Sequence, residues 1–276
     1  LGLDTQPSHL PAAFAPADGS PRALCDALIA YNQALIDGMS DLIGCVKVQA
    51  AYYERYGLEG MRAFSQTLRY ARAAGYVTIA DAKRNDIGAT AGAYAEAFLG
   101  DGDFSADFVT VNAYLGIDGV QPFLDIARQN DRGLFLLVKT SNPSGGQLQD
   151  LDCGGTTLYE RVADLVGEWG APLIGESGYS PIGAVVGATW PTQSTALRRR
   201  MPTAFFLVPG YGAQGATGKD LRGCFDERGG GAVVNASRSL LTAHQKRPDL
   251  PWLDAVRLEA TRMRDDITAG FAHGEE

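Results

Sequence analysis

The sequence is poor in the residues that build metal sites, disulfide frameworks and serine–histidine triads. Its 276 residues include only four cysteines and three histidines. The cysteines are far apart and form no C-x-x-C pair, and the histidines are scattered, so neither a zinc site nor a nucleophilic triad is supported. We interpret the cysteines as reduced thiols. These residues are Cys25, Cys45, Cys153 and Cys224, with His9, His244 and His273.

The chain also lacks an excess of positive charge and any long apolar run. Its formal net charge of -8 argues against a nucleic-acid partner, which would normally meet a basic face. We find no run of about 18 apolar residues and no signal-peptide pattern at the start. We therefore expect a cytoplasmic protein with no membrane partner. Because the chain begins inside a predicted strand without an initiator Met, we also expect further residues upstream in the natural protein.

What the sequence does contain is a repeated alternation of short apolar runs with longer amphipathic stretches. Several runs are apolar throughout, which is typical of strands covered on both faces. Eight such units predict an α/β protein, a single (β/α)₈ TIM barrel forming one catalytic domain over residues 1–276, although a doubly wound open sheet would show the same alternation. Strands are predicted at 1–4, 44–49, 76–82, 107–111, 133–139, 182–188, 204–208 and 231–235, and helices at 21–38, 58–74, 86–99, 117–129, 155–169, 191–200 and 252–271.

The third predicted strand ends in the charged run D-A-K-R-N-D, residues 81–86. Catalytic groups of a β/α barrel stand where strands end. Asp81 and Lys83 are two residues apart, so both should face the barrel mouth and contact each other. Asp86 follows the strand and opens the next helical pattern. Two carboxylates around one lysine exceed what structural neutrality needs and indicate a catalytic cluster. The alternative is a helix-capping Asp86 beside a structural ion pair.

Polar residues also mark other predicted strands. Lys47 lies in the middle of the apolar run G-C-V-K-V-Q-A, where a buried charge is unfavourable unless it has a purpose. A lysine that extends its ammonium group to solvent is the alternative interpretation. Asp4 ends the first strand, and Ser141 follows the fifth in the run K-T-S.

The loops after strands seven and eight have the composition of a phosphate site. Glycines in V-P-G-Y-G-A-Q-G-A-T-G let backbone N–H groups approach an anion, Gln214 can donate from its amide, and Arg238 offers a planar fork. A glycine-rich surface loop without a ligand is the alternative. Three of the glycines also fit G-x-G-x-x-G, but the motif occurs late in the chain and lacks the acidic ribose ligand of a dinucleotide site.

Taken together, these residues closely resemble the orotidine 5′-monophosphate decarboxylase family, in its longer bacterial form, over nearly the whole chain. The most specific element is D-A-K-R-N-D-I-G-A-T, from Asp81 to Thr90, supported by Lys47, by S-N-P-S at 141–144 and by the two phosphate loops. The resemblance implies decarboxylation of orotidine 5′-monophosphate to uridine 5′-monophosphate in pyrimidine nucleotide synthesis. It also implies no metal, no organic cofactor and a homodimer with shared active sites.

The resemblance further implies a role for each matching residue. Lys83 would stabilise and then protonate the C6 carbanion, Asp81 would face the substrate carboxylate, and Asp86 of the partner subunit would orient Lys83. The substrate-binding residues would be Asp4 and Lys47 for the ribose, Thr90 from across the interface, Ser141 for the pyrimidine edge, Gln214 and Arg238 for the 5′-phosphate with Pro209 in the same loops, and Asn112, whose particular role the resemblance leaves open.

Two rival functions remain open. One is a barrel with the same D-x-K-x-x-D strand that acts on a sugar phosphate with Mg²⁺, and its activity would be lost in a chelator. The other is a catalytically silent nucleotide-binding protein, which would not need a lysine between two carboxylates. The Ser141 loop, which suits a pyrimidine, favours the decarboxylase.

Overall fold

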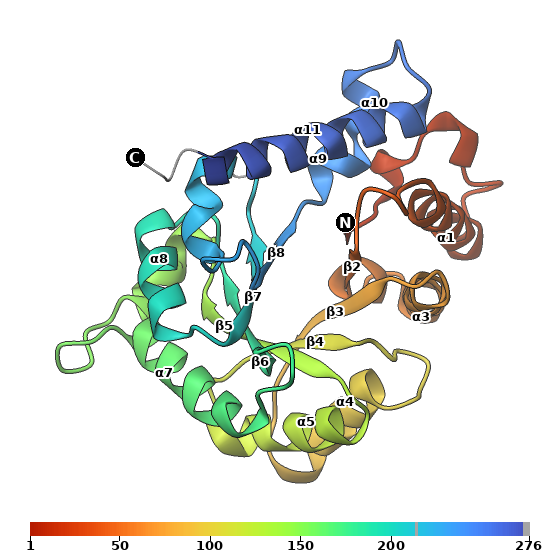
Figure 1. Cartoon of the computed structure of the whole chain (residues 1–276). Coiled ribbons are helices and arrows are strands. Elements are labelled where there is room, and N and C mark those ends of the chain that lie inside the picture. Colours follow the sequence, from red (N-terminus) through yellow and green to blue (C-terminus); the bar gives the residue numbers. More distant parts are fainter. Residues whose placement is uncertain (213–214, 273–276) are drawn as a thin grey trace.

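The structure, a computed structural model, describes residues 1–212 and 215–272 and contains one sheet of eight parallel strands in sequence order. The strands curve into a barrel with the long helices outside it (Figure 1). At the seam the Gly2 N–H donates to the carbonyl oxygen of Ala236 at 2.8 Å, so the barrel is nearly closed and the predicted (β/α)₈ fold is confirmed. The strands are β1 (Gly2–Leu3), β2 (Cys45–Gln49), β3 (Val77–Arg84), β4 (Phe108–Val111), β5 (Gly133–Lys139), β6 (Ser180–Val186), β7 (Ala204–Pro209) and β8 (Ala232–Asn235).

The helices that cover the barrel begin at recognisable sequence signals. Ser20 caps the first of them by accepting a hydrogen bond from the Ala23 N–H at 3.1 Å, ahead of Pro21. The α-helices are α1 (Pro21–Gly38), α2 (Ala51–Glu54), α3 (Gly57–Ala73), α4 (Gly88–Leu99), α5 (Ile117–Gln129), α6 (Gly146–Gln149), α7 (Leu158–Gly170), α8 (Pro191–Arg200), α9 (Arg238–Leu241), α10 (Ala243–Lys246) and α11 (Trp252–Ala272).

Predicted and observed bounds differ where the backbone turns. Helix α7 begins at Leu158 instead of residue 155, because Gly154 and Gly155 have φ angles of 82° and 93° and Thr157 forms a capping box with Glu160. Strand β6 begins at Ser180 and ends at Val186, two residues earlier than predicted at each end. The short helices α2, α6, α9 and α10 were not predicted, since four residues carry too little periodicity to detect.

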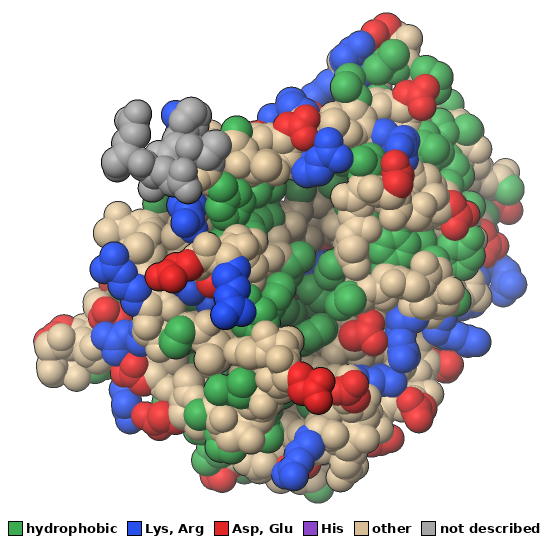
Figure 2. Space-filling view, viewed as in Figure 1, with side chains coloured by type: hydrophobic (Ala, Val, Ile, Leu, Met, Phe, Trp, Pro, Cys, Tyr) green, Lys and Arg blue, Asp and Glu red, His purple; other side chains and the backbone are tan. Residues whose placement is uncertain are grey.

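The interior of the barrel is filled at mid-height by four apolar side chains that form a core layer separate from the main core between strands and helices. They come from β3, β5, β6 and β7, and they lie between two cavities. Ile79 and Phe135 line an apolar cavity among the strand beginnings, whereas Val185 and Leu207 line a polar cavity among the strand ends. The face shown in Figure 2 is hollowed at its centre, where hydrophobic side chains are visible.

Within residues 1–212 and 215–272, no helix combines the length and hydropathy that crossing a bilayer requires.

Candidate active site

The polar cavity at the carboxyl ends of the strands brings together most of the charged residues that the sequence singled out. It has a volume of about 520 Å³. Two ammonium groups, Lys47 and Lys83, face two carboxylates, Asp4 and Asp81, so these four charges cancel. Arg238 on the cavity wall then leaves one positive charge among these five residues. A cavity of this kind suits an anionic ligand, although the whole chain is acidic.

Asp81 is the centre of this charged cluster. Its side chain is 8% exposed, and its two oxygens accept from Lys47 Nζ at 2.8 Å and Lys83 Nζ at 2.5 Å. The hydroxyl of Thr110 and the amide of Gln49 each donate to it at 2.9 Å. Four donors from β2, β3 and β4 therefore hold one carboxylate in a fixed orientation, which is the preorganisation that electrostatic catalysis requires.

The electrostatics of the cluster keep its members charged. Burial alone would raise the pKa of Asp81, but the ammonium groups of Lys47 and Lys83 and their hydrogen bonds hold that pKa well below its usual range. Burial likewise disfavours the charged form of Lys47, yet the carboxylates of Asp81 and Asp4 outweigh it and raise the pKa of this lysine. Both groups are therefore ionised across the neutral range.

Lys83 occupies an unusual stretch of backbone. Its φ angle of 47° lies in the left-handed region that a non-glycine residue rarely adopts. The register between β3 and β4 shifts here, from Ala80 beside Val109 to Arg84 beside Val111, so four steps on β3 match two on β4. The Lys83 N–H donates to the Thr110 hydroxyl at 2.9 Å instead of to a ladder carbonyl. Such bulges re-aim side chains beside active sites.

The remaining predicted site residues divide into three groups. Ser141 and Pro209 line the cavity with the cluster. Asp86, Thr90 and Asn112 are not among the residues that line it. Gln214 lies outside the described residues.

Two of the three residues that do not line the cavity, Asp86 and Asn112, have identifiable local contacts. Asp86 accepts from the Ile87 N–H at 2.8 Å, but helix α4 has no side-chain cap, so the capping alternative is not what the structure contains. Asn112 turns away to accept from the Tyr114 N–H at 2.9 Å, which fixes the loop after β4.

Sequence reasoning missed several residues of the cavity wall. Gln49 stands two residues after Lys47 on β2, and strand alternation could have identified it. His9 and Tyr52 belong to short helical turns with no sequence signal. Burial, with some help from Arg238 and His244 and against the charge of Asp4, lowers the pKa of His9, so this histidine is neutral at pH 7.

Among residues 1–212 and 215–272, no three His, Cys, Asp or Glu side chains are grouped so that they could hold a metal ion.

A nearly closed (β/α)₈ barrel with a cluster of charged side chains in a pocket at its strand ends is typical of one class of protein, the β/α-barrel enzymes. A model of the orotidine 5′-phosphate decarboxylase / HUMPS family matches residues 22–250, and the chain belongs to this family. It is an enzyme of that family.

Individual relatives agree with the family assignment. Orotidine 5′-phosphate decarboxylase of Rhodopirellula baltica is 41% identical over 97% of this chain and 93% of its own length. The enzyme of the same name from Clostridium acetobutylicum is also 41% identical, with the same shares covered. A solved structure of Leishmania donovani OMP decarboxylase superposes with a TM-score of 0.76 and 32% identity, covering 98% of this chain and 92% of that one.

Proposed function

We propose that this enzyme converts orotidine 5′-monophosphate to uridine 5′-monophosphate and CO₂ without a metal or organic cofactor. The observation that carries the proposal is the buried Asp81 carboxylate held between Lys47 and Lys83 in a pocket that an anion suits. The names of the 41% identical relatives support the substrate and with it a place in pyrimidine nucleotide synthesis.

The chemistry explains the need for a fixed cation. When the bond from C6 to the carboxylate carbon breaks, CO₂ leaves and the electron pair stays on C6 in the ring plane, out of reach of the ring π system. Lys83 stabilises this pair electrostatically and then transfers a proton from Nζ to C6, and water later returns a proton to the amine. The Lys83 side chain is 45% exposed, so its ammonium group is accessible from the cavity.

Asp81 acts on both partners of this step. Its low pKa keeps it negative, so it holds the Lys83 ammonium in position and faces the carboxylate that is about to leave. Lys47 and Asp4, joined at 3.6 Å, form a polar pair that suits two ribose hydroxyls. Ser141 contacts the pyrimidine edge, while Pro209, Gln214 and Arg238 surround the 5′-phosphate. The phosphate is remote from C6, and its binding energy holds the ring against the charged cluster.

The working form in this proposal is a cytoplasmic homodimer of one-domain subunits, with Asp86 and Thr90 of each subunit completing the other's site. Asp86 and Thr90 sit beside a group of exposed apolar side chains, which is the usual mark of a protein interface. These side chains, 36% to 77% exposed, are Ile87, Tyr94, Tyr114, Leu115 and Ile117. Asn112 supports the loop after β4 that carries two of them, Tyr114 and Leu115.

The deciding experiment follows the loss of orotidine 5′-monophosphate absorbance with the purified protein in excess EDTA. We expect full turnover in the presence of the chelator, and no turnover in a control mixture without enzyme. Turnover that disappears in EDTA and returns with Mg²⁺ would contradict the metal-free mechanism. Absence of nucleotide turnover together with Mg²⁺-dependent activity on a sugar phosphate would favour the first rival, and binding of the nucleotide without turnover would favour a silent binding protein.

A further inference from the structure

Lys139, the last residue of β5, is a buried cation that the proposed chemistry does not use. Its side chain is 0% exposed, and its Nζ lies 4.9 Å from the ring centre of Tyr159 and 4.7 Å from that of Trp190. Fully buried lysines are rare, and aromatic faces attract an ammonium group at these distances. The end of β5 therefore holds its cation in an aromatic box.

The counter-charge for this cation comes from the loop that follows. Asp150, eleven residues further along the chain, forms an ion pair and hydrogen bond with Lys139 Nζ while its own side chain remains 47% exposed. Burying an ammonium group is unfavourable unless it is paired. The burial of Lys139 and the folding back of the loop around Asp150 must therefore occur together.

The residues beside this ion pair fix the backbone at Thr140. The Gln149 side chain accepts from the Thr140 N–H at 3.1 Å and donates to its hydroxyl at 2.7 Å. Trp190 Nε1 donates to the Thr140 carbonyl oxygen at 2.8 Å. One tryptophan therefore contacts the ammonium group with its ring and the next residue with its N–H.

Ser141 is held in the same way by the segment that follows β6. Its carbonyl oxygen accepts from the Thr189 hydroxyl at 3.2 Å. Gly187 packs so closely that a Cβ there would lie 2.7 Å from the Ser141 Cα, and a side chain would push Ser141 away. Thr140, Ser141 and Asn142 all line the polar cavity, so this packing decides the shape of one of its walls.

We propose that Lys139 and Asp150 form a positioning clamp, which folds the loop after β5 in advance and so holds Ser141 and Asn142 in the wall of the substrate cavity. The clamp rests on the proposed function, because it serves a substrate that enters this cavity. Lys139 touches no reacting atom in this scheme. It acts through the loop.

A clamp of this kind has a specific kinetic signature. If the loop is ordered before the substrate arrives, releasing it lowers the fraction of binding-competent enzyme and weakens apparent affinity in proportion. Substrate and transition state lose the same contacts, so KM rises while kcat changes little. A residue that merely supports the fold would change neither constant in the molecules that remain folded.

The test compares Asp150→Ala, Lys139→Met and the double variant, with Asp164→Ala as the matched control. Asp164 is a partly exposed carboxylate on α7 that pairs with Arg200 at 2.7 Å, on the same side of the barrel but outside the loop. We expect Asp150→Ala to raise KM, and the dissociation constant of added UMP, about 10-fold with kcat within about threefold. The double variant should bind UMP no more weakly than the weaker-binding single variant, because the two substitutions remove the same interaction.

Limited proteolysis of the loop supplies a readout that does not depend on turnover. Residues 144–155 should be cleaved faster in Asp150→Ala than in the wild type and in Asp164→Ala. Asp150→Ala also keeps the test decisive where Lys139→Met does not fold. Wild-type protein that leaves orotidine 5′-monophosphate unchanged would contradict the proposed function alone. Equal cleavage rates in all three forms, or a fall in kcat at constant KM, would overturn the clamp.

Discussion

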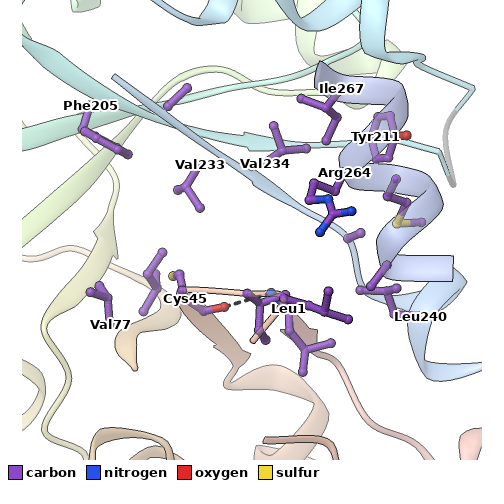
Figure 3. A pocket seen from close by; sticks show the side chains of 18 of the residues that line it. Leu1, Cys45, Val77, Phe205, Tyr211, Val233, Val234, Leu240, Arg264 and Ile267 are labelled. Carbon is purple, nitrogen blue, oxygen red and sulfur yellow. Dashed lines mark hydrogen bonds between the residues drawn. The ribbon is translucent and has the colours of Figure 1, made fainter. Parts of the chain in front are cut away.

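The two cavities of this barrel differ in chemistry far more than in size. The one among the strand beginnings measures about 620 Å³ and is lined mainly by apolar side chains, against about 520 Å³ for the charged one. Figure 3 shows Val77, Phe205 and Val233 around the apolar cavity, with the amino group of Leu1 donating to the carbonyl oxygen of Cys45 at 2.9 Å. The larger of these two cavities is not the one that holds the charged cluster. Paired charges with shifted pKa values make the strand-end cavity the candidate site.

The largest difference between the cavities should appear on removing one cation from each. We expect Lys83→Ala to lower kcat by about 10⁴-fold, since both electrostatic stabilisation and proton transfer are lost. Arg264, which is exposed at the apolar cavity and pairs with Asp265 at 3.0 Å, serves as the control, and Arg264→Ala should retain wild-type turnover. Binding of UMP to Lys83→Ala should persist. Comparable losses in both variants would end the assignment of chemistry to the strand ends.

A second difference concerns stability and its dependence on pH. Asp81→Asn leaves Lys47 buried without its nearest counter-charge and should lower the free energy of unfolding at pH 7 by about 3 kcal/mol. Because the folded pKa of Asp81 is depressed, its contribution is fully present above the ordinary carboxylate pKa, near 4, and is lost as pH falls toward the folded value.

Urea unfolding at pH 7 and near pH 3 measures this second difference. The gap between the wild type and Asp81→Asn should narrow on acidification. The control is Asp265→Asn, which removes an exposed ion pair with Arg264 of the apolar cavity, and we expect that pair to contribute less than about 0.5 kcal/mol at either pH. A gap that stays constant down to pH 3 would mean that Asp81 is not held ionised by its neighbours.

The third difference is in anion binding. Arg238→Ala should weaken the binding of UMP about 30-fold, because a charge-assisted hydrogen bond to the phosphate contributes about 2 kcal/mol. The binding of uridine, which lacks the phosphate, should not change. Inhibition constants for the two ligands measure this directly. Equal weakening of UMP and uridine binding would contradict the assignment of Arg238 to the phosphate.

The smallest difference compares one hydroxyl with one added pair of methyl groups. Thr110→Val keeps its shape but removes the hydroxyl that joins Asp81 to the Lys83 N–H, and we expect a loss of about 1–2 kcal/mol in stability. Ala232→Val, which fills part of the apolar cavity from β8, should instead add about 1 kcal/mol at unchanged kcat. Thermal unfolding of both variants tests this contrast. Melting temperatures that shift in the same direction in the two variants would contradict it.

Sequence reasoning reached the barrel and its charged centre because both depend on local patterns. Apolar runs mark strands, and a charge inside such a run, as at Lys47, is too unfavourable to be accidental. What escaped prediction depends on distant partners. Lys139 ends an equally apolar run, but its significance depends on Asp150 in a loop without periodicity. His9 reaches the cavity only because the chain after β1 folds over the strand ends.

The left-handed backbone at Lys83 has a consequence for how this enzyme could evolve. Holding a side chain at a φ angle of 47° opposes folding by about 1 kcal/mol or more, and glycine would relieve that strain. Selection for stability alone would therefore favour replacing this lysine, to which we assign the proton transfer. Selection for the proposed reaction would then be what retains lysine at this position. We expect a relative with glycine there to have a stable barrel but to lack this chemistry.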